Sequence, residues 1–366
     1  MAFSPSRLSV ARRRRGLTKR ALADAVGVAE STIMAYESAR RTPPSTIIRR
    51  IARVLGFPLS FFEAKELERI TEEAASFRAL SRMKSAQRER ALAGGELAIE
   101  LNEWMESQFR FQPLDLPDLR PQSDPEAAAM ALRTRWGLSD KPISNMIHLL
   151  EAKGVRVFSL AEDCEEVDAF SLRRGHQAFV FLNTMKSSER SRFDAAHELG
   201  HLALHQHGQA LGRAAEAEAT DFASAFLMPR SSVLAYAPKV PTIKNIIDAK
   251  KFWGVSAAAL AHRLHEVGRL SEWHYRMLCI EIQRLGYRKA EPESAPRELS
   301  QALEKVFAAL RKEKIQKVDV AQVLSWPLGE LRALVFNLVL GARLGGGPVR
   351  DKPKVSLADK HLRLAN

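Results

Sequence analysis

The stretch that decides the fold and the chemistry of this chain is FDAAHELGHLALH, residues 193–205. It contains His197-Glu198-Leu199-Gly200-His201, in which two histidines stand four residues apart. Four residues advance a helix by about 400°, so the two imidazoles lie about 40° apart on one face and can bind one metal ion. Glu198, about 100° further round, can hold a water molecule beside the metal without binding the metal itself.

Apolar residues surround the two histidines and indicate that this helix is largely buried. They are Ala195, Ala196, Leu199, Leu202 and Ala203. A buried imidazole needs a ligand or a hydrogen-bond partner, so the pattern favours a metal site over a helix with solvated histidines. Zinc in such a site polarises a carbonyl and activates water, and the glutamate moves the proton to the leaving amine. We therefore predict a zinc site of the metallopeptidase type.

Two further histidines are weak candidates for the third ligand. His207 stands six residues after His201, and Leu204 occupies the position where a glycine would have to break the helix. Without that break, six residues rotate the chain by about 600°, to the wrong side. His205 shares a face with His201 but lies about 12 Å along the axis from His197, so we expect it at the rim of the site.

The next predicted helix, 214–228, offers better candidates for the third ligand. Glu216 shares its face with a stripe of small and apolar side chains that suits close packing on the histidine helix, namely Ala219, Thr220, Ala223 and Leu227. Glu216 is therefore the predicted ligand, with Glu218 as the alternative. We expect Asp221 to lie outside the ligand shell or on the surface.

Positive charge is concentrated at the N-terminal end of the chain. The 366 residues carry a net charge of +13, and residues 1–62 hold twelve Lys or Arg against three acidic residues, which gives +9. Such a distribution is typical of a module that binds a polyanion. Four of these cations, Arg12–Arg15, are consecutive. At most two of them can face one groove, so DNA contact and simple solvation are both open.

The same region has the pattern of a helix-turn-helix. Thr18 can cap a helix whose apolar residues Leu22 and Val26 share one face, and Gly27 can make the tight turn after it. A second helix, about 30–38, follows three residues later. Two helices joined in this way form a helix-turn-helix, whose second helix can enter the major groove of DNA.

The outward positions of this module are the predicted DNA contacts. Ser and Thr can touch base edges, whereas Lys and Arg suit phosphates. The candidates are Thr18, Lys19, Glu30, Ser31, Thr32, Met34, Arg40 and Arg41. The alternative is a helical protein–protein module with a solvated basic face, which the local charge disfavours.

The remaining pattern predicts an α+β protein that is predominantly helical. Apolar runs at 155–160, 169–172 and 177–183 are typical of strands, and we expect them to form a small antiparallel sheet. A charged helical stretch with a break at Gly94 and Gly95 leads into a proline-spaced connector. We divide the chain into a helix-turn-helix domain (1–65), a linker (66–123), a zinc metallopeptidase domain (124–290), and an accessory helical segment with a flexible tail (291–366).

Two family resemblances rest on these motifs. The N-terminal set resembles the XRE family of phage-repressor-like helix-turn-helix domains; it comprises Gly16-Leu17-Thr18, Leu22-Ala23, Val26-Gly27-Val28, Ser31-Thr32-Ile33, Tyr36-Glu37 and Pro44. The second set resembles the ImmA/IrrE family of zinc metallopeptidases (peptidase family M78); it comprises Phe181-Leu182-Asn183, Ala196 to Leu202, Glu216 to Ala219, and Phe226-Leu227-Met228-Pro229. The chain thus resembles bacterial proteins in which the two are fused.

The second resemblance implies a zinc cofactor and a role for each matching position. The implied zinc ligands are His197, His201 and Glu216, the general base is Glu198, and the oxyanion stabiliser is His262 or Tyr236. Characterised members of that family cleave helix-turn-helix repressors of mobile elements or stress responses. We therefore expect two partners, operator DNA and an XRE-type repressor that is the chain itself or another protein, with a homodimer on the DNA.

Composition excludes several classes of protein. The longest nearly unbroken apolar run, Ala333 to Leu340, is far shorter than the roughly 20 residues of a membrane span, and the N-terminus lacks the apolar core of a secretory signal. Two cysteines are too few for a disulfide framework, which favours the cytoplasm. Two hypotheses remain: a DNA-tethered zinc endopeptidase, or a non-proteolytic regulator or antitoxin whose metallopeptidase-like domain is a sensor or interaction module. Glu198 favours the first, because a structural zinc site has no use for a base that is not a ligand.

Overall fold

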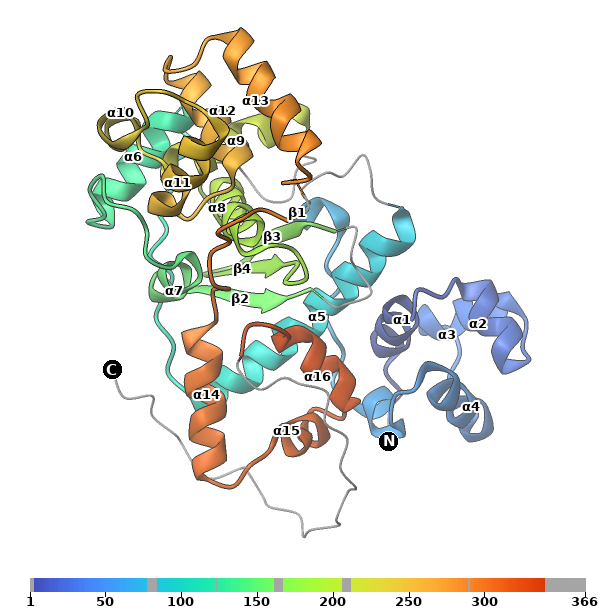
Figure 1. Ribbon diagram of the computed structural model, residues 1–366. Coiled ribbons are helices and arrows are strands. Elements are labelled where there is room, and N and C mark those ends of the chain that lie inside the picture. The colour runs from blue at the N-terminus through green and yellow to red at the C-terminus, as the bar shows by residue number, and fades with distance from the viewer. Residues whose placement is uncertain are drawn as a thin grey trace.

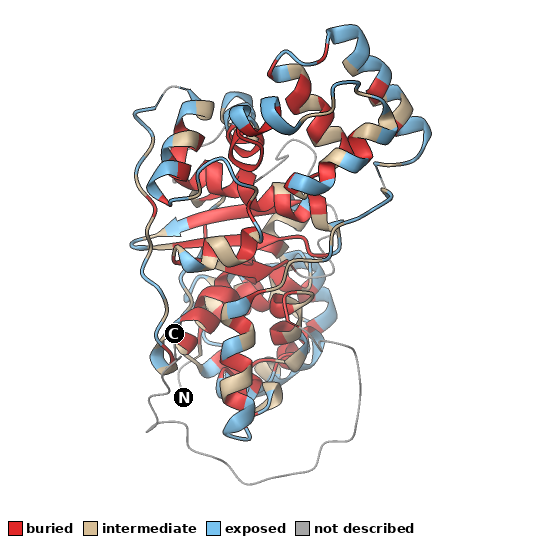
Figure 2. Ribbon diagram, turned by 60° about the vertical axis from the view of Figure 1, so that its left-hand side comes forward, coloured by how far each residue is buried: buried red, intermediate tan, exposed pale blue. Residues whose placement is uncertain are grey.

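The computed structural model describes residues 3–77, 84–122, 124–160, 167–205, 212–288 and 290–339. Over these residues the protein is predominantly helical, with a four-stranded sheet near its centre (Figure 1), so the predicted α+β class is confirmed. Buried residues are concentrated along the sheet and the helices that pack against it (Figure 2). None of the described helices is long and apolar enough to cross a membrane.

The sheet is mixed rather than antiparallel. Its strand order is β1-β3-β4-β2, with bounds β1 Ala75–Phe77, β2 Val155–Ser159, β3 Ala169–Arg174 and β4 Gln177–Leu182. The pairs β1–β3 and β3–β4 are antiparallel, but β2 and β4 are parallel, so the predicted antiparallel sheet is wrong in this pair. The reason is that β3 lies on the far side of β4. The hairpin from β3 then returns β4 next to β2 in the same direction.

Helix α8 (Ser188–Leu204) packs on one face of the sheet, and α9 (Arg213–Leu227) packs against α8. Alternation along β3 separates the two faces. Ser171 Oγ lies 3.5 Å from the carbonyl oxygen of Glu198 on α8, whereas Phe170 lies beside α5 (Ser85–Gln108). Gly200 lets α9 approach α8 closely, because a Cβ at this position would lie 3.1 Å from the ring of Phe222.

The N-terminal domain has the predicted helix-turn-helix. Its elements are α1 Pro5–Arg14, α2 Lys19–Val26, α3 Glu30–Glu37, α4 Ser45–Leu55 and the short 3₁₀ helix η1 Leu59–Glu63. The hydroxyl of Thr18 accepts a hydrogen bond from Ala21 N–H at 3.0 Å, so the predicted cap is confirmed. Gly27 follows α2 with φ at +75°, a conformation that glycine adopts without strain. The predicted turn is therefore also confirmed.

Helix α5 runs without interruption through Gly94 and Gly95, so the predicted break is wrong. The two glycines serve close packing instead. A Cβ at Gly95 would lie 3.0 Å from Ile70 and 3.4 Å from Phe170, and one at Gly94 would lie 3.4 Å from the guanidinium of Arg14. The predicted linker therefore contributes an edge strand, β1, and a packed helix, α5. The division of the chain into domains stays a prediction.

The arginine row of α1, Arg12–Arg15, is ion-paired within the protein, which neither alternative from the sequence anticipated. Arg12 pairs with Glu37 at 2.6 Å, Arg13 with Glu96 of α5 at 2.5 Å, and Arg14 and Arg15 both pair with Glu330, at 2.6 and 2.5 Å. Arg13 and Arg14 are about 95% buried, with side-chain exposures of 4% and 5%. The pair of Arg12 with Glu37 lies within the helix-turn-helix domain, whereas the pairs of Arg13, Arg14 and Arg15 hold this domain against α5 and against the C-terminal helix that carries Glu330.

The remaining helices lie around this frame. Their bounds are η2 Glu72–Ala74, α6 Pro125–Arg135, α7 Met146–Ala152, α10 Arg230–Tyr236, α11 Ile243–Trp253, α12 Ala257–Glu266, α13 Glu272–Arg284, α14 Gln301–Lys312, α15 Lys317–Val323 and α16 Leu328–Val335. The prediction of C-terminal helices is thus confirmed.

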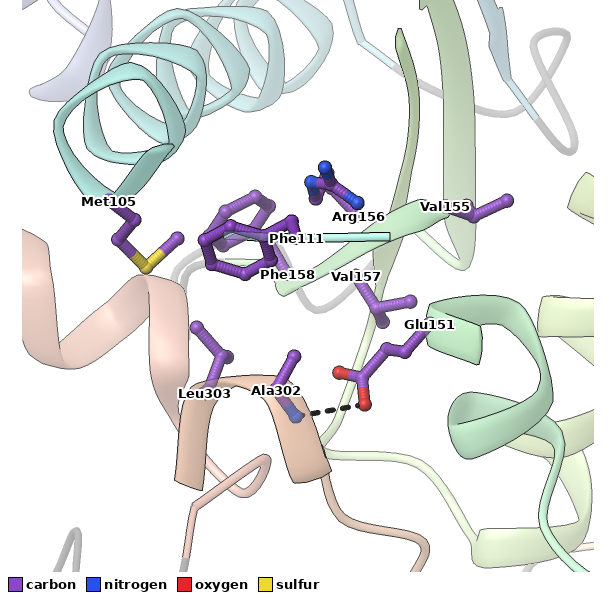
Figure 3. Close-up of a pocket in the computed structure, with 9 residues that line it drawn as sticks. All are labelled: Met105, Phe111, Glu151, Val155, Arg156, Val157, Phe158, Ala302 and Leu303. Atoms are coloured by element: carbon purple, nitrogen blue, oxygen red, sulfur yellow. Dashed lines mark hydrogen bonds between the residues drawn. The ribbon is translucent and has the colours of Figure 1, made fainter. Parts of the chain in front are cut away.

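A partly buried carboxylate attaches α14 to α7. Glu151 of α7 accepts a hydrogen bond from the hydroxyl of Ser300, just before α14. It accepts a second one from Ala302 N–H at 3.1 Å, at the start of α14 (Figure 3). Burial raises the pKa of Glu151, and these hydrogen bonds offset part of the rise. A cavity of about 20 Å³, large enough for one water molecule, adjoins it between Met105, Phe158 and Leu303.

Candidate metal centre

Two helices bring the three predicted metal ligands together. His197 and His201 lie on the buried face of α8, and Glu216 lies in the first turns of α9. The Nε2 atoms of the two histidines are 3.1 Å apart, and Glu216 lies 3.2 Å from His201 Nε2 and 3.6 Å from His197 Nε2. Within the described part of the chain, this is the one group of three or more His, Cys, Asp or Glu that could hold a metal ion.

The donor set fits zinc. Two imidazole nitrogens and one carboxylate oxygen, all within 4.8 Å of one another, leave a fourth position open, as in catalytic zinc sites. Burial raises the pKa of Glu216, but hydrogen bonds from His197 and His201 outweigh burial and lower this pKa to about 2. The carboxylate is therefore ionised at neutral pH, the form that binds a cation.

Glu198, the predicted base, is fully buried on α8 directly after His197. Its backbone carbonyl faces Ser171 of β3. The sheet and α9 thus enclose the segment of α8 that carries the motif. The Glu198 carboxylate is therefore shielded from solvent.

Each of the two predicted histidine ligands has a polar partner at its Nδ1 atom. Thr220 Oγ1 donates to the carbonyl oxygen of Glu216 at 2.8 Å and lies 3.3 Å from His197 Nδ1, where it can accept the imidazole proton. A proton on Nδ1 leaves Nε2 free to bind a metal. The sequence placed Thr220 only in a packing stripe. Its position one helical turn after Glu216 was the signal for this second role.

His205, a weak candidate for the third ligand, and Glu218, the alternative to Glu216, form a chain on the other side of His201. His205 Nδ1 lies 2.9 Å from His201 Nδ1, and His205 Nε2 lies 2.9 Å from Glu218 Oε2. This arrangement orients His201 from the side opposite to Glu216. His207 lies outside the described residues.

Replacing His205 with alanine is expected to weaken zinc binding about 10–100-fold, because His201 loses the group that fixes its ring and tautomer. Zinc affinity can be measured by competition with a chromophoric chelator. His274→Ala, an exposed histidine on α13, is the control and should bind zinc as the wild type does. Equal affinity in both variants would show that the contact between His201 and His205 does not support the site.

The two oxyanion candidates, His262 and Tyr236, make described contacts with residues other than His197, His201 and Glu216. His262 pairs with Glu266 at 3.4 Å, and Tyr236 is 63% exposed and stacks on Phe252. Burial raises the pKa of Asp221, and the neighbouring Glu266 adds to this rise. The oxyanion role of His262 or Tyr236 stays a prediction.

The predicted DNA contacts are accessible. Thr18, Glu30, Ser31, Met34, Arg40 and Arg41 are exposed, and Lys19 and Thr32 are partly exposed. The intervening residues Ile33 and Tyr36 are buried in the domain core, so α3 presents its polar side outward. A different face of the domain, which carries Arg13, Arg14 and Arg15, contacts α5 and α16.

Comparison with known families agrees with this organisation. Residues 150–265 match a peptidase family model described as an IrrE N-terminal-like domain. Residues 6–60 match the model of a helix-turn-helix domain. A search of curated proteins found no match. The first match spans α8 and α9, and the second spans α1 to α4.

Proposed function

Because the chain joins an XRE-like helix-turn-helix domain to an IrrE-like metallopeptidase domain, we propose that it is a DNA-bound regulator that cleaves a repressor. The observation that supports this most strongly is the convergence of His197, His201 and Glu216 with Glu198 next to them on α8. The proposed reaction is hydrolysis of a peptide bond in an XRE-type repressor, either the chain itself or a partner. The proposed location is the cytoplasm.

The residues of the metal centre would have different roles in peptide hydrolysis. His197, His201 and Glu216 would hold the zinc, which supplies Lewis acidity toward water and the peptide carbonyl when bound. Glu198 accepts a proton from the attacking water at its carboxylate and returns the proton to the leaving amine. Thr220 and His205 keep the two imidazoles in position.

Zinc-dependent cleavage tests the proposal. The full chain, loaded with one equivalent of zinc, is incubated with XRE-type repressors from its own genome, and products are identified by mass spectrometry. We expect cleavage at a defined bond that stops when the zinc is chelated and returns when zinc is restored. Intact repressors under every metal condition, with DNA binding retained, would instead favour the non-proteolytic regulator or antitoxin.

The helix-turn-helix domain would select the DNA on which the protein acts. Its α3 enters the major groove, Ser31 and Thr32 reach base edges, and Arg40 and Arg41 meet phosphates. A homodimer would place two such helices on paired half-sites. The arginine row is not part of the proposed DNA surface, because its side chains are paired inside the protein.

Replacing both Arg40 and Arg41 with glutamine is expected to weaken binding to all DNA sequences and to reduce the slope of log affinity against log salt by about 2. Fluorescence anisotropy with a selected operator, at several salt concentrations, measures both quantities. Arg276→Gln, on the exposed side of α13, is the matched control and should leave the slope unchanged. An unchanged slope in the double variant would place the phosphate contacts elsewhere.

A further inference from the structure

A cavity of about 320 Å³ lies apart from the metal centre, where four segments of the chain meet. These are the loop 142–145, the start of α8, the end of α11 and the segment 295–298. On α8, Ser188 at the cavity is nine residues from His197, which corresponds to about 13 Å along the helix. The volume is sufficient for a small metabolite.

The wall of this cavity carries more positive than negative charge. Arg192, Lys251 and Arg297 line it, against one carboxylate, Glu298. Glu298 already has partners within the protein. It pairs with Arg192, and it accepts a hydrogen bond at 2.8 Å from Met146 N–H at the start of α7. Lys251 pairs with Glu293 at 3.3 Å, outside the cavity. Two of the three cations therefore have carboxylate partners.

Arg297 is the cation that is not compensated. Its Nη2 donates to the carbonyl oxygen of Lys186 at 2.6 Å, and no carboxylate among the described residues pairs with its guanidinium. Burial lowers the pKa of Arg297, and no acidic neighbour raises it. Arg297 lines the cavity and is half-buried, so an anion in the cavity would supply the counter-charge that the protein does not provide.

Two further features suit an organic anion. The 17-residue helix α8 begins at the cavity with Ser188, and the N-terminus of a helix carries positive potential. Apolar and aromatic side chains also line the cavity, namely Phe252, Trp253 and Pro296. A guanidinium beside an aromatic wall is a combination that binds a carboxylate or phosphate head together with an apolar body.

We propose that this cavity binds a small organic anion, with its carboxylate or phosphate group on Arg297 at the start of α8 and its apolar body against Phe252 and Pro296. This site goes beyond the peptidase and DNA-binding functions. The bound anion would lie against the helix that carries the metal ligands, since Arg192 precedes His197 by five residues, or about 7.5 Å.

Isothermal titration of the full chain tests the proposal, with benzoate and inorganic phosphate as probes at constant ionic strength. We expect saturable binding of at least one probe. Arg297→Gln should weaken this binding about tenfold or more, because a charged hydrogen bond is lost. Arg276→Gln, which removes an exposed arginine of α13, is the matched control and should bind as the wild type does.

The Arg297 variant also separates the cavity from other places where an anion could bind. Binding at the metal centre or at the DNA-binding surface would be unchanged in Arg297→Gln, and that result would overturn the proposal. Absence of saturable binding of both probes to the wild type would overturn it as well. Circular dichroism and thermal unfolding show whether the variant is folded, and Arg297→Lys, which keeps the charge, should recover part of the affinity.

Discussion

Replacing Glu198 with glutamine is expected to lower the rate of repressor cleavage by about 10²–10⁴-fold while zinc stays bound. Glutamine has nearly the same shape as glutamate but cannot accept a proton from water. The three proposed zinc ligands are untouched, because Glu198 is not one of them. The change therefore separates proton transfer from metal binding.

The measurement is a time course of cleavage with matched zinc content, determined by elemental analysis for each protein. His197→Ala provides the contrasting case, because it should lose zinc and activity together. Cleavage by Glu198→Gln at the wild-type rate would remove Glu198 from the mechanism and would point to a contaminating protease. Loss of zinc from Glu198→Gln would contradict the assignment of Glu198 as a base that is not a ligand.

Replacing Glu330 with glutamine is expected to lower the free energy of unfolding by about 3–5 kcal/mol at neutral pH. Glu330 is the carboxylate partner of both Arg14 and Arg15, and its side chain is only 5% exposed. The variant would leave the buried guanidinium of Arg14 without its counter-charge. Urea denaturation measures the loss, and Glu304→Gln, which breaks an exposed ion pair on α14, should change stability by only about 0.5 kcal/mol.

The pKa of Glu330 determines how the difference in the free energy of unfolding between wild type and Glu330→Gln depends on pH. Burial raises the pKa of Glu330, but Arg14 and Arg15 outweigh burial and hold the pKa below its ordinary value of 4.5. A carboxylate whose pKa is lowered by folding stabilises the folded state above its unfolded pKa and loses that effect as the pH falls. The gap between wild type and Glu330→Gln should thus be full near pH 7 and shrink as the pH falls below about 4.5. A gap that is constant across this range would mean that packing, rather than charge, accounts for the loss.

Local patterns were sufficient for the features that depend on neighbouring residues. Helical spacing placed His197 and His201 on one face, and the stripe of small residues after Glu216 oriented α9 against them. Thr18 and Gly27 fixed the ends of α2, because capping and turn geometry are set within a few residues. These expectations needed no knowledge of distant contacts.

Features that depend on contacts between distant residues could not be predicted in this way. The parallel pairing of β2 with β4 requires knowing that β3 lies on the far side of β4. Gly94 and Gly95 resemble a helix break until Phe170 and Arg14 are seen packed against them. The partner of Arg14 is 316 residues away along the chain, so the basic run could be read only as DNA-binding or solvated.

This last contact has a consequence for how the protein is made. Helix α1 leaves the ribosome early, whereas α16, which carries Glu330, is translated more than 300 residues later. During synthesis Arg14 and Arg15 are therefore without their carboxylate partner, and the helix-turn-helix domain can contact α5 before it can contact α16. A nascent chain that stalls before α16 would carry the helix-turn-helix domain without one of the contacts that fix its orientation.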